Sequence, residues 1–197
     1  MPLRESDAPS DPLTLFRRWY RKAQGERAPH PVAMALATSG QSGPSVRMVL
    51  YKGIEDGSFL FYSNYDSRKG RDLSDDNRAA IVILFVTHHQ VRVSGTVRRL
   101  SRKASLAYFK TRERGAQLSA LASRQSRVIP SREVLEKAFW KLSAKYPGDV
   151  PLPDDWGGYA LRPQWIEFWE GRSDRLHDRL RYRRNVGGGW RIERLAP

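Results

Sequence analysis

The stretch that decides the fold is a pair of β-like runs joined by a short polar turn: VAMALAT (residues 32–38), SGQSGP (39–44) and SVRMVLYK (45–52). Alternate residues of the last run share a face, with Arg47, Val49 and Tyr51 on one side and Met48, Leu50 and Lys52 on the other. A connection this short suits antiparallel neighbours. The region is therefore predicted to be a β-hairpin.

Further β-like segments surround this hairpin along the chain. They lie at 58–63, 79–86 and 90–100, and near the C-terminus at 158–161, 165–169, 176–184 and 190–195. Residues 79–86 are almost wholly apolar, which predicts a strand that is buried on both faces.

Helical segments are expected at 67–73, 101–110, 113–123 and 131–145, and Ser67, Ser101 and Ser131 are suited to N-capping. An earlier helix starts with Asp11 as N-cap and Pro12 in the first turn. The order of helix, five strands, helices and four strands predicts a mainly β protein with peripheral helices (α+β), built as a closed antiparallel barrel. We expect residues 1–10 to be a flexible tail and residues 11–197 to form one domain.

Charge and composition narrow the functional classes. The chain has 35 Lys+Arg against 21 Asp+Glu, a net charge of +14, and it has no cysteine. The absence of cysteine excludes disulfides and a thiol nucleophile. No apolar run reaches the ~20 residues that cross a bilayer, so a soluble, cytoplasmic protein is expected. The positive charge fits either a nucleic acid or a phosphorylated small molecule, and composition leaves both open.

The segment Arg175-Leu176-His177-Asp178-Arg179 is the most distinctive local motif. In an extended chain, Arg175, His177 and Arg179 lie on one face. Three potential cations side by side repel one another unless an anion lies between them. The segment is either an anion-binding face or a solvated basic edge strand.

A second motif is Ser67-Arg68-Lys69, at the start of a predicted helix. Cations at a helix N-terminus oppose the helix dipole. They are favourable there if an external phosphate binds at that terminus. The alternative is that Arg68 and Lys69 are two solvated surface cations.

Two other candidate groups are weaker signals. Tyr108 and Arg112 are four residues apart, which would place them on one face of a helix. His88 and His89 have no partner at metal-ligand spacing, so no metal site is expected. Patterns typical of serine hydrolases, P-loops and dinucleotide-binding folds are absent from the sequence.

Taken together, these segments resemble the pyridoxine/pyridoxamine 5′-phosphate oxidase family. The resemblance covers roughly residues 11–197, and no single motif carries it. The matching stretches, in order along the chain, are 11–16, 47–52, 61–62, 67–69, 90–93, 108–109 with Arg112, 123–126, 156–158, 166–169, 175–179 and 194–197.

The resemblance implies an FMN-binding split β-barrel that works as a homodimer, with FMN at the subunit interface. The reaction it implies is oxidation of pyridoxine and pyridoxamine 5′-phosphates to pyridoxal 5′-phosphate, with O2 reduced to H2O2. The residues implied for FMN, some from the partner subunit, are Arg47, Met48, Val49, Leu50, Lys52, Tyr62, Ser63, Arg68, Lys69, Gln90, Gln125, Ser126, Trp169 and Arg179. Those implied for the substrate phosphate are Lys52, Tyr108 and Arg112, while Arg175 and His177 would contact the pyridine ring and take part in catalysis.

The chain departs from the family pattern mainly around the substrate phosphate. A serine that usually follows the arginine by four positions is Ala116 here, and the connection from Phe85 to Gln90 is short. These changes keep one alternative open, a related split-barrel flavin oxidase of the phenazine-biosynthesis type. The net charge of +14 keeps open a second alternative, a basic nucleic-acid-binding module.

Overall fold

A computed structural model describes residues 3–25, 33–85 and 88–197. Its helices are the 3-10 helix η1 (Glu5–Asp7), α1 (Pro12–Gly25), α2 (Arg68–Asp75), α3 (Arg102–Lys110), α4 (Arg114–Ala122) and α5 (Arg132–Lys145). Its strands are β1 (Ala33–Gly40), β2 (Gly43–Leu50), β3 (Ile54–Glu55), β4 (Ser58–Asn64), β5 (Arg78–Phe85), β6 (His89–Arg99), β7 (Trp156–Glu170), β8 (Asp178–Arg184) and β9 (Trp190–Arg194). The expected strand ends at Val32 and Val86 lie outside the described residues, as does part of the short connection before Gln90.

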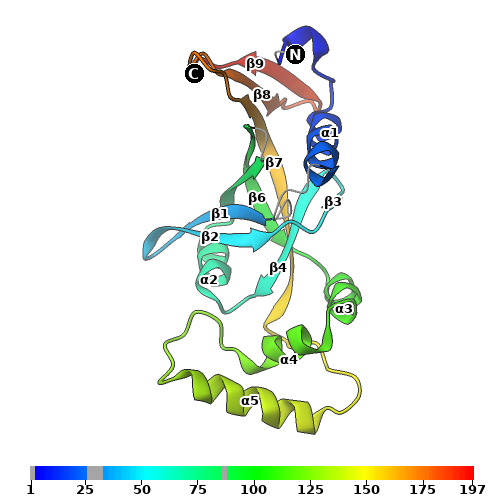
Figure 1. Cartoon of the computed structure of the whole chain (residues 1–197), viewed down its shortest axis with the longest axis vertical. Coiled ribbons are helices and arrows are strands. Elements are labelled where there is room, and N and C mark those ends of the chain that lie inside the picture. The colour runs from blue at the N-terminus through cyan, green and yellow to red at the C-terminus, as the bar shows by residue number, and fades with distance from the viewer. Residues whose placement is uncertain (1–2, 26–32, 86–87) are drawn as a thin grey trace.

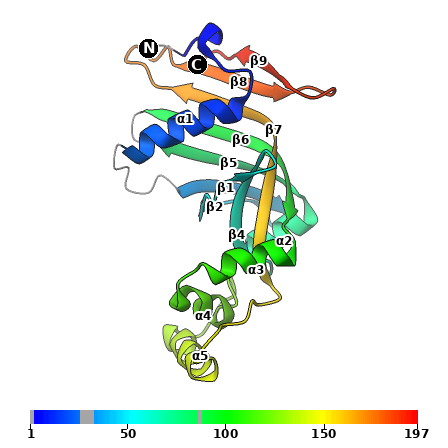
Figure 2. The same ribbon diagram turned by 90° about the vertical axis from the view of Figure 1, so that its right-hand side faces the viewer.

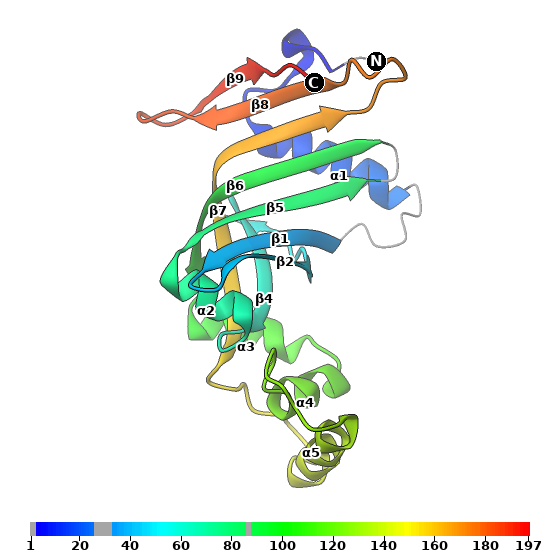
Figure 3. The ribbon, with the colours of Figure 1, turned by 90° about the vertical axis from the view of Figure 1, so that its left-hand side faces the viewer.

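The strands form one antiparallel sheet in the order β2-β1-β5-β6-β7-β4-β3, and β8 and β9 extend it from β7. The sheet curls until its ends meet. The Lys52 N–H donates to Leu60 O and the Leu60 N–H donates to Gly53 O, both at 2.9 Å, which joins the end of β2 to β4. β8 and β9 lie at one end of the molecule with the N-terminus, and α3, α4 and α5 lie towards the other (Figures 1, 2 and 3). The predicted antiparallel barrel with peripheral helices is confirmed.

β5 has one buried and one open face. Ile81 and Ile83 point into the core and are each 1% exposed, whereas Leu84 is 70% exposed. The prediction that both faces of this strand are buried is therefore wrong for the single chain. The open face continues across β1 to β2, where Val46 and Met48 are 68% and 64% exposed. An exposed apolar patch of this kind usually marks a contact with another molecule.

β7 is one strand of 15 residues where the sequence predicted two shorter ones. It pairs with β6 along its length, with β4 through its first half and with β8 through its second half. The gap between the two predicted strands is a β-bulge: Ser94 of β6 pairs with Trp165, while the next residue, Gly95, pairs with Pro163. Glycine is required at this point because a Cβ on Gly95 would lie 1.9 Å from Arg162 O.

Three of the four N-cap residues that the sequence predicted accept a capping hydrogen bond. Asp11 Oδ1 accepts a hydrogen bond from the Leu13 N–H at 3.0 Å at the start of α1. Ser67 and Ser101 cap α2 and α3 as predicted: each side chain accepts a hydrogen bond from the backbone N–H three residues later. Ser131 precedes α5 but makes no capping bond with its side chain.

Two apolar clusters stabilise the molecule. The larger fills the barrel and includes α1, whose Phe16 is fully buried and packs edge-on against Phe59, with ring centroids 4.9 Å apart. The smaller joins α3 and α4 to the start of β7, with Phe109, Leu118 and Trp156 as its buried centre. Among the described residues, no helix has both the length and the apolarity to span a bilayer.

Residues 3–10, expected to belong to a flexible tail, pack on the barrel instead. Leu3 is 7% exposed and joins the main core, and the Tyr182 hydroxyl donates to Pro9 O at 2.9 Å. The Arg194 guanidinium donates to both carboxylate oxygens of Glu5, at 2.7 and 2.8 Å. The contacts come from β8 and β9, which are distant in sequence, so the local composition of the segment gave no sign of them.

Candidate functional site

A pocket of about 280 Å³ lies between the end of β2, β4, the start of α2 and α3. Its walls are cationic and aromatic. The lining residues are Met48, Val49, Leu50, Lys52, Tyr62, Ser63, Lys69, Tyr108, Arg112, Gln125 and Trp156. All of them except Trp156 were named from the sequence as candidate cofactor or substrate residues.

Lys69 is the buried cation of this pocket, and it is 7% exposed. Its Nζ donates to Ser63 Oγ at 2.9 Å, Ser67 Oγ at 3.1 Å and Gln125 Oε1 at 2.7 Å. These acceptors are neutral. Burial, together with the nearby Arg47, lowers the pKa of Lys69 to about 8, while Asp72 opposes the shift. A buried ammonium held only by neutral oxygens is a favourable place for an anion.

Arg47 lies beside this pocket, on the face of the hairpin that packs against α2. Its Nη1 donates to Thr38 Oγ1 at 2.6 Å and to Leu36 O at 3.2 Å. Its Nη2 lies 3.5 Å from Asp72 Oδ2. Burial lowers the pKa of Arg47, and the Asp72 carboxylate partly offsets this effect. Arg47 is thus held rigidly beside Lys69.

The aromatic wall is a stack of three rings. The Tyr62 and Tyr108 rings are stacked with centroids 3.8 Å apart, and Trp156 lies 5.7 Å from Tyr62 and nearly parallel to both tyrosines. The Arg112 guanidinium lies 4.8 Å from the Trp156 ring, and Lys52 Nζ lies 5.6 Å from the Tyr108 ring. Such contacts are cation–π interactions.

Arg112 has a buried Nη1 with no hydrogen-bond partner among the described residues. Burial lowers its pKa. The sequence predicted that Tyr108 and Arg112 share one face of a helix, and this is wrong. Helix α3 ends at Lys110, and the Arg112 N–H donates to Phe109 O in the turn that follows. The tight turn after α3 nevertheless places both side chains in one pocket.

Arg68 and Ser126, both implied for FMN, do not line the pocket. Arg68 is exposed, and its Nη2 donates to Ser42 O at 3.3 Å. Ser126 is also exposed and has a positive φ of 71°.

A second group of candidate residues lies across β6, β7 and β8. Gln90, Trp169 and Arg179 are cross-strand neighbours in one row. The Arg179 Nε donates to Glu167 Oε1 at 2.9 Å, and Arg92 Nη1 donates to Glu167 Oε2 at 3.3 Å. Glu167 is 3% exposed, so a buried carboxylate fixes Arg179 in place.

Arg175 and His177 lie in the turn between β7 and β8, not on a strand. β8 begins at Asp178, and Arg175 has a positive φ of 67°. The alternation used to place Arg175, His177 and Arg179 on one face therefore does not apply to the first two. The His177 ring lies next to Trp169, with centroids 4.8 Å apart, which brings it to the end of the row described above.

The two groups are well separated within one chain. None of Gln90, Trp169, Arg175, His177 and Arg179 lines the pocket at α3. β2 and β8 are five strands apart in the sheet order, which corresponds to ~24 Å along the sheet at ~4.8 Å per strand. Figure 1 shows β8 and α3 towards opposite ends of the molecule.

Sequence reasoning missed the carboxylates that hold the arginines. Asp72 accepts from Thr38 Oγ1 at 2.7 Å beside Arg47, and Glu167 pairs with Arg92 and Arg179. The available signal for Glu167 was a single charge between the apolar Ile166 and Phe168 of a strand. Among the described residues, no group of His, Asp and Glu has the arrangement of a metal site.

Comparison with known proteins identifies the family. Residues 21–146 match a family model described as pyridoxamine 5′-phosphate oxidase, and residues 156–197 match one described as the pyridoxine 5′-phosphate oxidase C-terminal dimerisation region. A pyridoxine/pyridoxamine 5′-phosphate oxidase of Salinibacter ruber is 50% identical over 95% of this chain and 89% of its own length. One from Cupriavidus taiwanensis is 48% identical over 99% of this chain and 93% of its own length.

Solved structures agree with this comparison. PhzG from Burkholderia lata, in complex with tetrahydrophenazine-1-carboxylic acid, superposes with a TM-score of 0.93 at 34% identity, covering 99% of this chain and 98% of that one. A pyridoxamine 5′-phosphate oxidase-related, FMN-binding protein from Nostoc punctiforme has the same fold, with a TM-score of 0.76 at 19% identity over 96% and 98% of the two chains. The chain has the split β-barrel fold and belongs to the pyridoxine/pyridoxamine 5′-phosphate oxidase family.

Proposed function

We propose that this protein oxidises pyridoxamine 5′-phosphate and pyridoxine 5′-phosphate to pyridoxal 5′-phosphate, with FMN as cofactor and O2 reduced to H2O2. The observation that carries the proposal is the buried Nη1 of the half-buried Arg112, which has no partner among the described residues in a pocket that also holds Lys52 and Lys69. Guanidinium and ammonium groups in this setting suit phosphate groups, which accept several charge-assisted hydrogen bonds.

The residues around Lys69 fit the phosphate of FMN. Lys69 offers a buried ammonium at the N-terminus of α2, where the helix dipole also favours an anion. Arg47 adds a second fixed cation, and Ser63 and Gln125 add neutral polar groups at hydrogen-bonding distance from Lys69. When bound, FMN supplies redox chemistry that amino-acid side chains do not provide.

The residues around Arg112 fit the phosphate of the substrate. Arg112 and Lys52 would bind it, and Tyr108 would donate its hydroxyl while its ring stays stacked on Tyr62. Arg112 lies against the Trp156 ring, and no carboxylate in the described part of the chain forms an ion pair with it. Its hydrogen-bonding capacity is therefore available to a ligand.

We propose that the remaining residues of each site come from a second copy of the chain. His177 and Arg175 would contact the substrate ring, and Gln90, Trp169 and Arg179 would contact FMN. The apolar face of β2 and β5, with its exposed Val46, Met48, Leu50 and Leu84, is suited to cover such a dimer interface. The match of residues 156–197 to a dimerisation region supports the same arrangement.

Mixed dimers test this arrangement. Co-expression of a chain carrying R112M with a chain carrying both R175M and H177N is expected to restore about a quarter of the wild-type rate. Random pairing makes about half of the dimers mixed, and one of their two sites is intact. The measurement is turnover of the mixture against each variant alone, at a substrate concentration below the wild-type KM, where R112M alone is nearly inactive. Absence of any recovery, although mixed dimers form, would show that each site is built within one chain.

The function itself is tested with purified protein. We expect bound flavin in its absorbance spectrum, and release of H2O2 in step with pyridoxal 5′-phosphate when either B6 phosphate is added. A protein that binds flavin but oxidises neither phosphate contradicts the proposed substrate. A protein that takes up no FMN contradicts the proposed cofactor.

Ala116, in α4, gives a smaller prediction about the substrate. Replacing it by serine (A116S) is expected to lower the KM for pyridoxamine 5′-phosphate by about threefold to tenfold, since one added hydrogen bond contributes ~0.5–1.5 kcal/mol. Initial rates over a range of substrate concentrations measure the effect, and A120S in the same helix is the control. An unchanged KM means that this position does not contact the phosphate.

A second candidate is an oxidase of the phenazine-biosynthesis type. It is favoured by the close superposition on PhzG and by Ala116 in place of the usual serine. Lys52, Tyr108 and Arg112 in the pocket favour the B6 phosphates instead. Oxidation of tetrahydrophenazine-1-carboxylic acid, the compound bound in the PhzG structure, without any oxidation of the B6 phosphates would select the second candidate.

The nucleic-acid alternative has less support. Much of the C-terminal positive charge is paired within the protein, through Arg179 with Glu167, Arg181 with Glu193 and Arg194 with Glu5. Arginines that are held by carboxylates of their own chain are less available to a polyanion.

A further inference from the structure

The turn that carries Arg175 and His177 is fixed by few contacts of its own. It spans residues 171–177 between β7 and β8, and residues 173–176 are exposed. Arg175 holds a positive φ of 67°, which non-glycine residues rarely adopt. Within the turn, the Leu176 N–H donates to Asp174 Oδ1 at 3.1 Å. Such a turn depends on contacts from outside to keep one conformation.

One backbone contact defines the proton position on His177. The Arg172 N–H donates to His177 Nδ1 at 3.0 Å. Nδ1 accepts this bond, so the proton of the neutral ring is on Nε2. His177 thus presents Nε2–H as a hydrogen-bond donor, while its ring lies against Trp169.

The Arg172 side chain is anchored on two carboxylates. Its Nε and Nη2 donate to Asp178 Oδ2 at 2.8 and 2.5 Å, and Nη2 lies 3.5 Å from Glu170 Oε2. Burial on its own would raise the pKa of Asp178, but hydrogen bonds from Arg172 and Arg194 outweigh it and hold the pKa below its usual value. Asp178 is therefore a charged carboxylate at the base of the turn.

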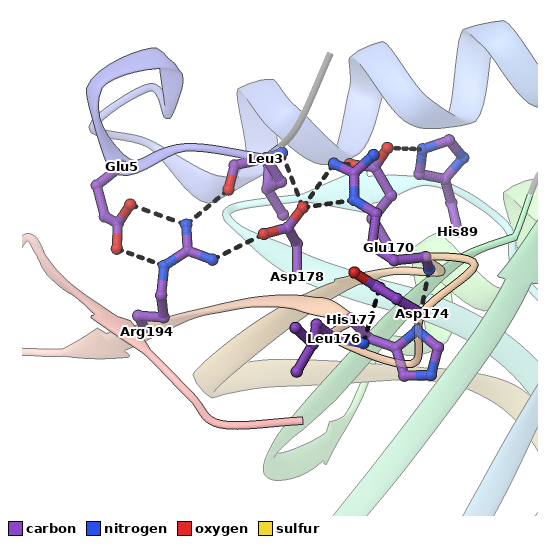
Figure 4. A network of polar contacts seen from close by, with 10 residues as sticks. Leu3, Glu5, His89, Glu170, Asp174, Leu176, His177, Asp178 and Arg194 are labelled. Carbon is purple, nitrogen blue, oxygen red and sulfur yellow. Dashed lines mark hydrogen bonds and ion pairs between the residues drawn. The ribbon is translucent and has the colours of Figure 1, made fainter.

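Asp178 in turn is bound by the N-terminal segment and the C-terminal strand. Arg194 Nη1 donates to Asp178 Oδ1 at 2.9 Å, and the Leu3 N–H donates to Asp178 Oδ2 at 3.4 Å. Arg194 also donates to Glu5 and to Leu3 O. Figure 4 shows these side chains converging above the turn.

We propose that Glu5, Arg194, Asp178 and Arg172 form one chain of ion pairs that holds His177 in its Nε2–H form. In this arrangement residues 3–7 support the active site, and Arg172 and Asp178 are positioning residues for His177. The inference rests on the proposed function for its catalytic consequence. The tautomer of His177 does not depend on the proposed function and can be measured without turnover.

The first test is R172A in the FMN-loaded dimer. The backbone N–H remains, so the change isolates the guanidinium. We expect kcat for pyridoxamine 5′-phosphate to fall about tenfold with KM and flavin content unchanged, less than the ~10²-fold that a 1 Å misplacement can cause. 15N NMR of the imidazole is expected to show a single Nε2–H form in the wild type and a mixture of tautomers in R172A.

Two variants separate positioning from simple loss of charge. R172K keeps a cation that can reach Asp178, and it is expected to recover most of kcat and the single His177 form. R132A removes an exposed arginine that pairs with Glu136 on α5, and it is expected to behave as wild type.

The second test is E5Q, at the far end of the chain of ion pairs. We expect kcat to fall by about twofold to fivefold, the range set by one exposed ion pair. The matched control is E136Q, because Glu5 and Glu136 are both 51% exposed and each lies 2.7 Å from an arginine Nε. E136Q is expected to leave kcat unchanged.

The inference is overturned if R172A and E5Q leave both kcat and the His177 signals as in wild type. A wild-type protein that oxidises neither B6 phosphate contradicts the proposed function but not this inference. In that case the inference is tested by the tautomer of His177 alone, compared between wild type, R172A and E5Q.

Discussion

Replacement of Arg112 by methionine (R112M) is expected to raise the KM for pyridoxamine 5′-phosphate by about 10²-fold while leaving the thermal stability of the protein equal or higher. Arg112 is half-buried, burial lowers its pKa, and its buried Nη1 has no partner among the described residues. Its removal relieves a desolvation cost in the free protein. It also removes from the complex a charge-assisted contact with phosphate worth up to ~3 kcal/mol.

The matched control for R112M is R114M. Arg114 is exposed and donates to the carbonyl oxygens of Gly148 and Tyr146 at the end of α5. This variant is expected to lose some stability with little change in KM, the reverse of R112M. The two readouts are steady-state kinetics and thermal unfolding of the FMN-loaded protein. A loss of stability in R112M with an unchanged KM would falsify the role of Arg112 at the substrate phosphate.

Replacement of Lys69 by methionine (K69M) is expected to weaken FMN binding by about 10²-fold. The loss corresponds to one buried charge-assisted contact of ~2–3 kcal/mol. Lys69 is 7% exposed and its present acceptors are the neutral oxygens of Ser63, Ser67 and Gln125. The measurement is quenching of flavin fluorescence during titration of FMN-free protein.

K103M provides a close control for K69M. Lys103 follows a capping serine and an arginine at the start of α3, as Lys69 does at the start of α2, but it is exposed. K103M is expected to leave the Kd for FMN unchanged. Equal effects of the two substitutions would mean that general positive charge, and not the buried site, binds the phosphate.

The pH dependence of FMN binding gives an independent check on Lys69. Burial lowers its pKa to about 8 in the FMN-free protein, so the ammonium is present below this pH and is lost above it. A bound phosphate favours the charged form and raises the pKa. Affinity should therefore be constant below pH 8 and fall by up to about tenfold per unit above it in the wild type, but not in K69M.

The lowered pKa of Lys69 affects the stability of the FMN-free protein in the opposite direction: stability rises with pH, whereas FMN affinity falls. The folded state releases the Lys69 proton more easily than the unfolded state, whose pKa is near the ordinary value of 10.5. The contribution of Lys69 to stability therefore rises as the pH increases from about 8 to 10.5. FMN should remove most of this dependence.

Local patterns in the sequence were sufficient to predict most of the helices and strands. The hairpin of β1 and β2, the capped starts of α1, α2 and α3, and the antiparallel barrel all follow from strand alternation and from capping residues, which act over a few positions. The single strand β7 did not follow, because its bulge opposite Gly95 interrupts the alternation without ending the pairing. Neither did the N-terminal segment, whose contacts come from β8 and β9.

In the candidate site too, some residues could be named from the sequence and others only from the structure. Lys69 was implied for FMN, and Tyr108 and Arg112 for the substrate; the structure brings all three into one pocket. Arg175 and His177 were named on an alternation that the turn does not have, and the resemblance to a known family was needed to single them out. The carboxylates Asp72 and Glu167, which fix the arginines, became visible only once strands and helices were packed.

The sequence by itself determined the strand and helix pattern, the positive charge, and two copies of the tripeptide Ser-Arg-Lys, at 67–69 and 101–103. Both copies cap and begin a helix. Only the tertiary structure decided that Lys69 is buried beside Arg47 and Gln125 while Lys103 faces the solvent. The physical reason is that capping is settled within three residues, whereas desolvation of a cation depends on elements that are far apart in the chain.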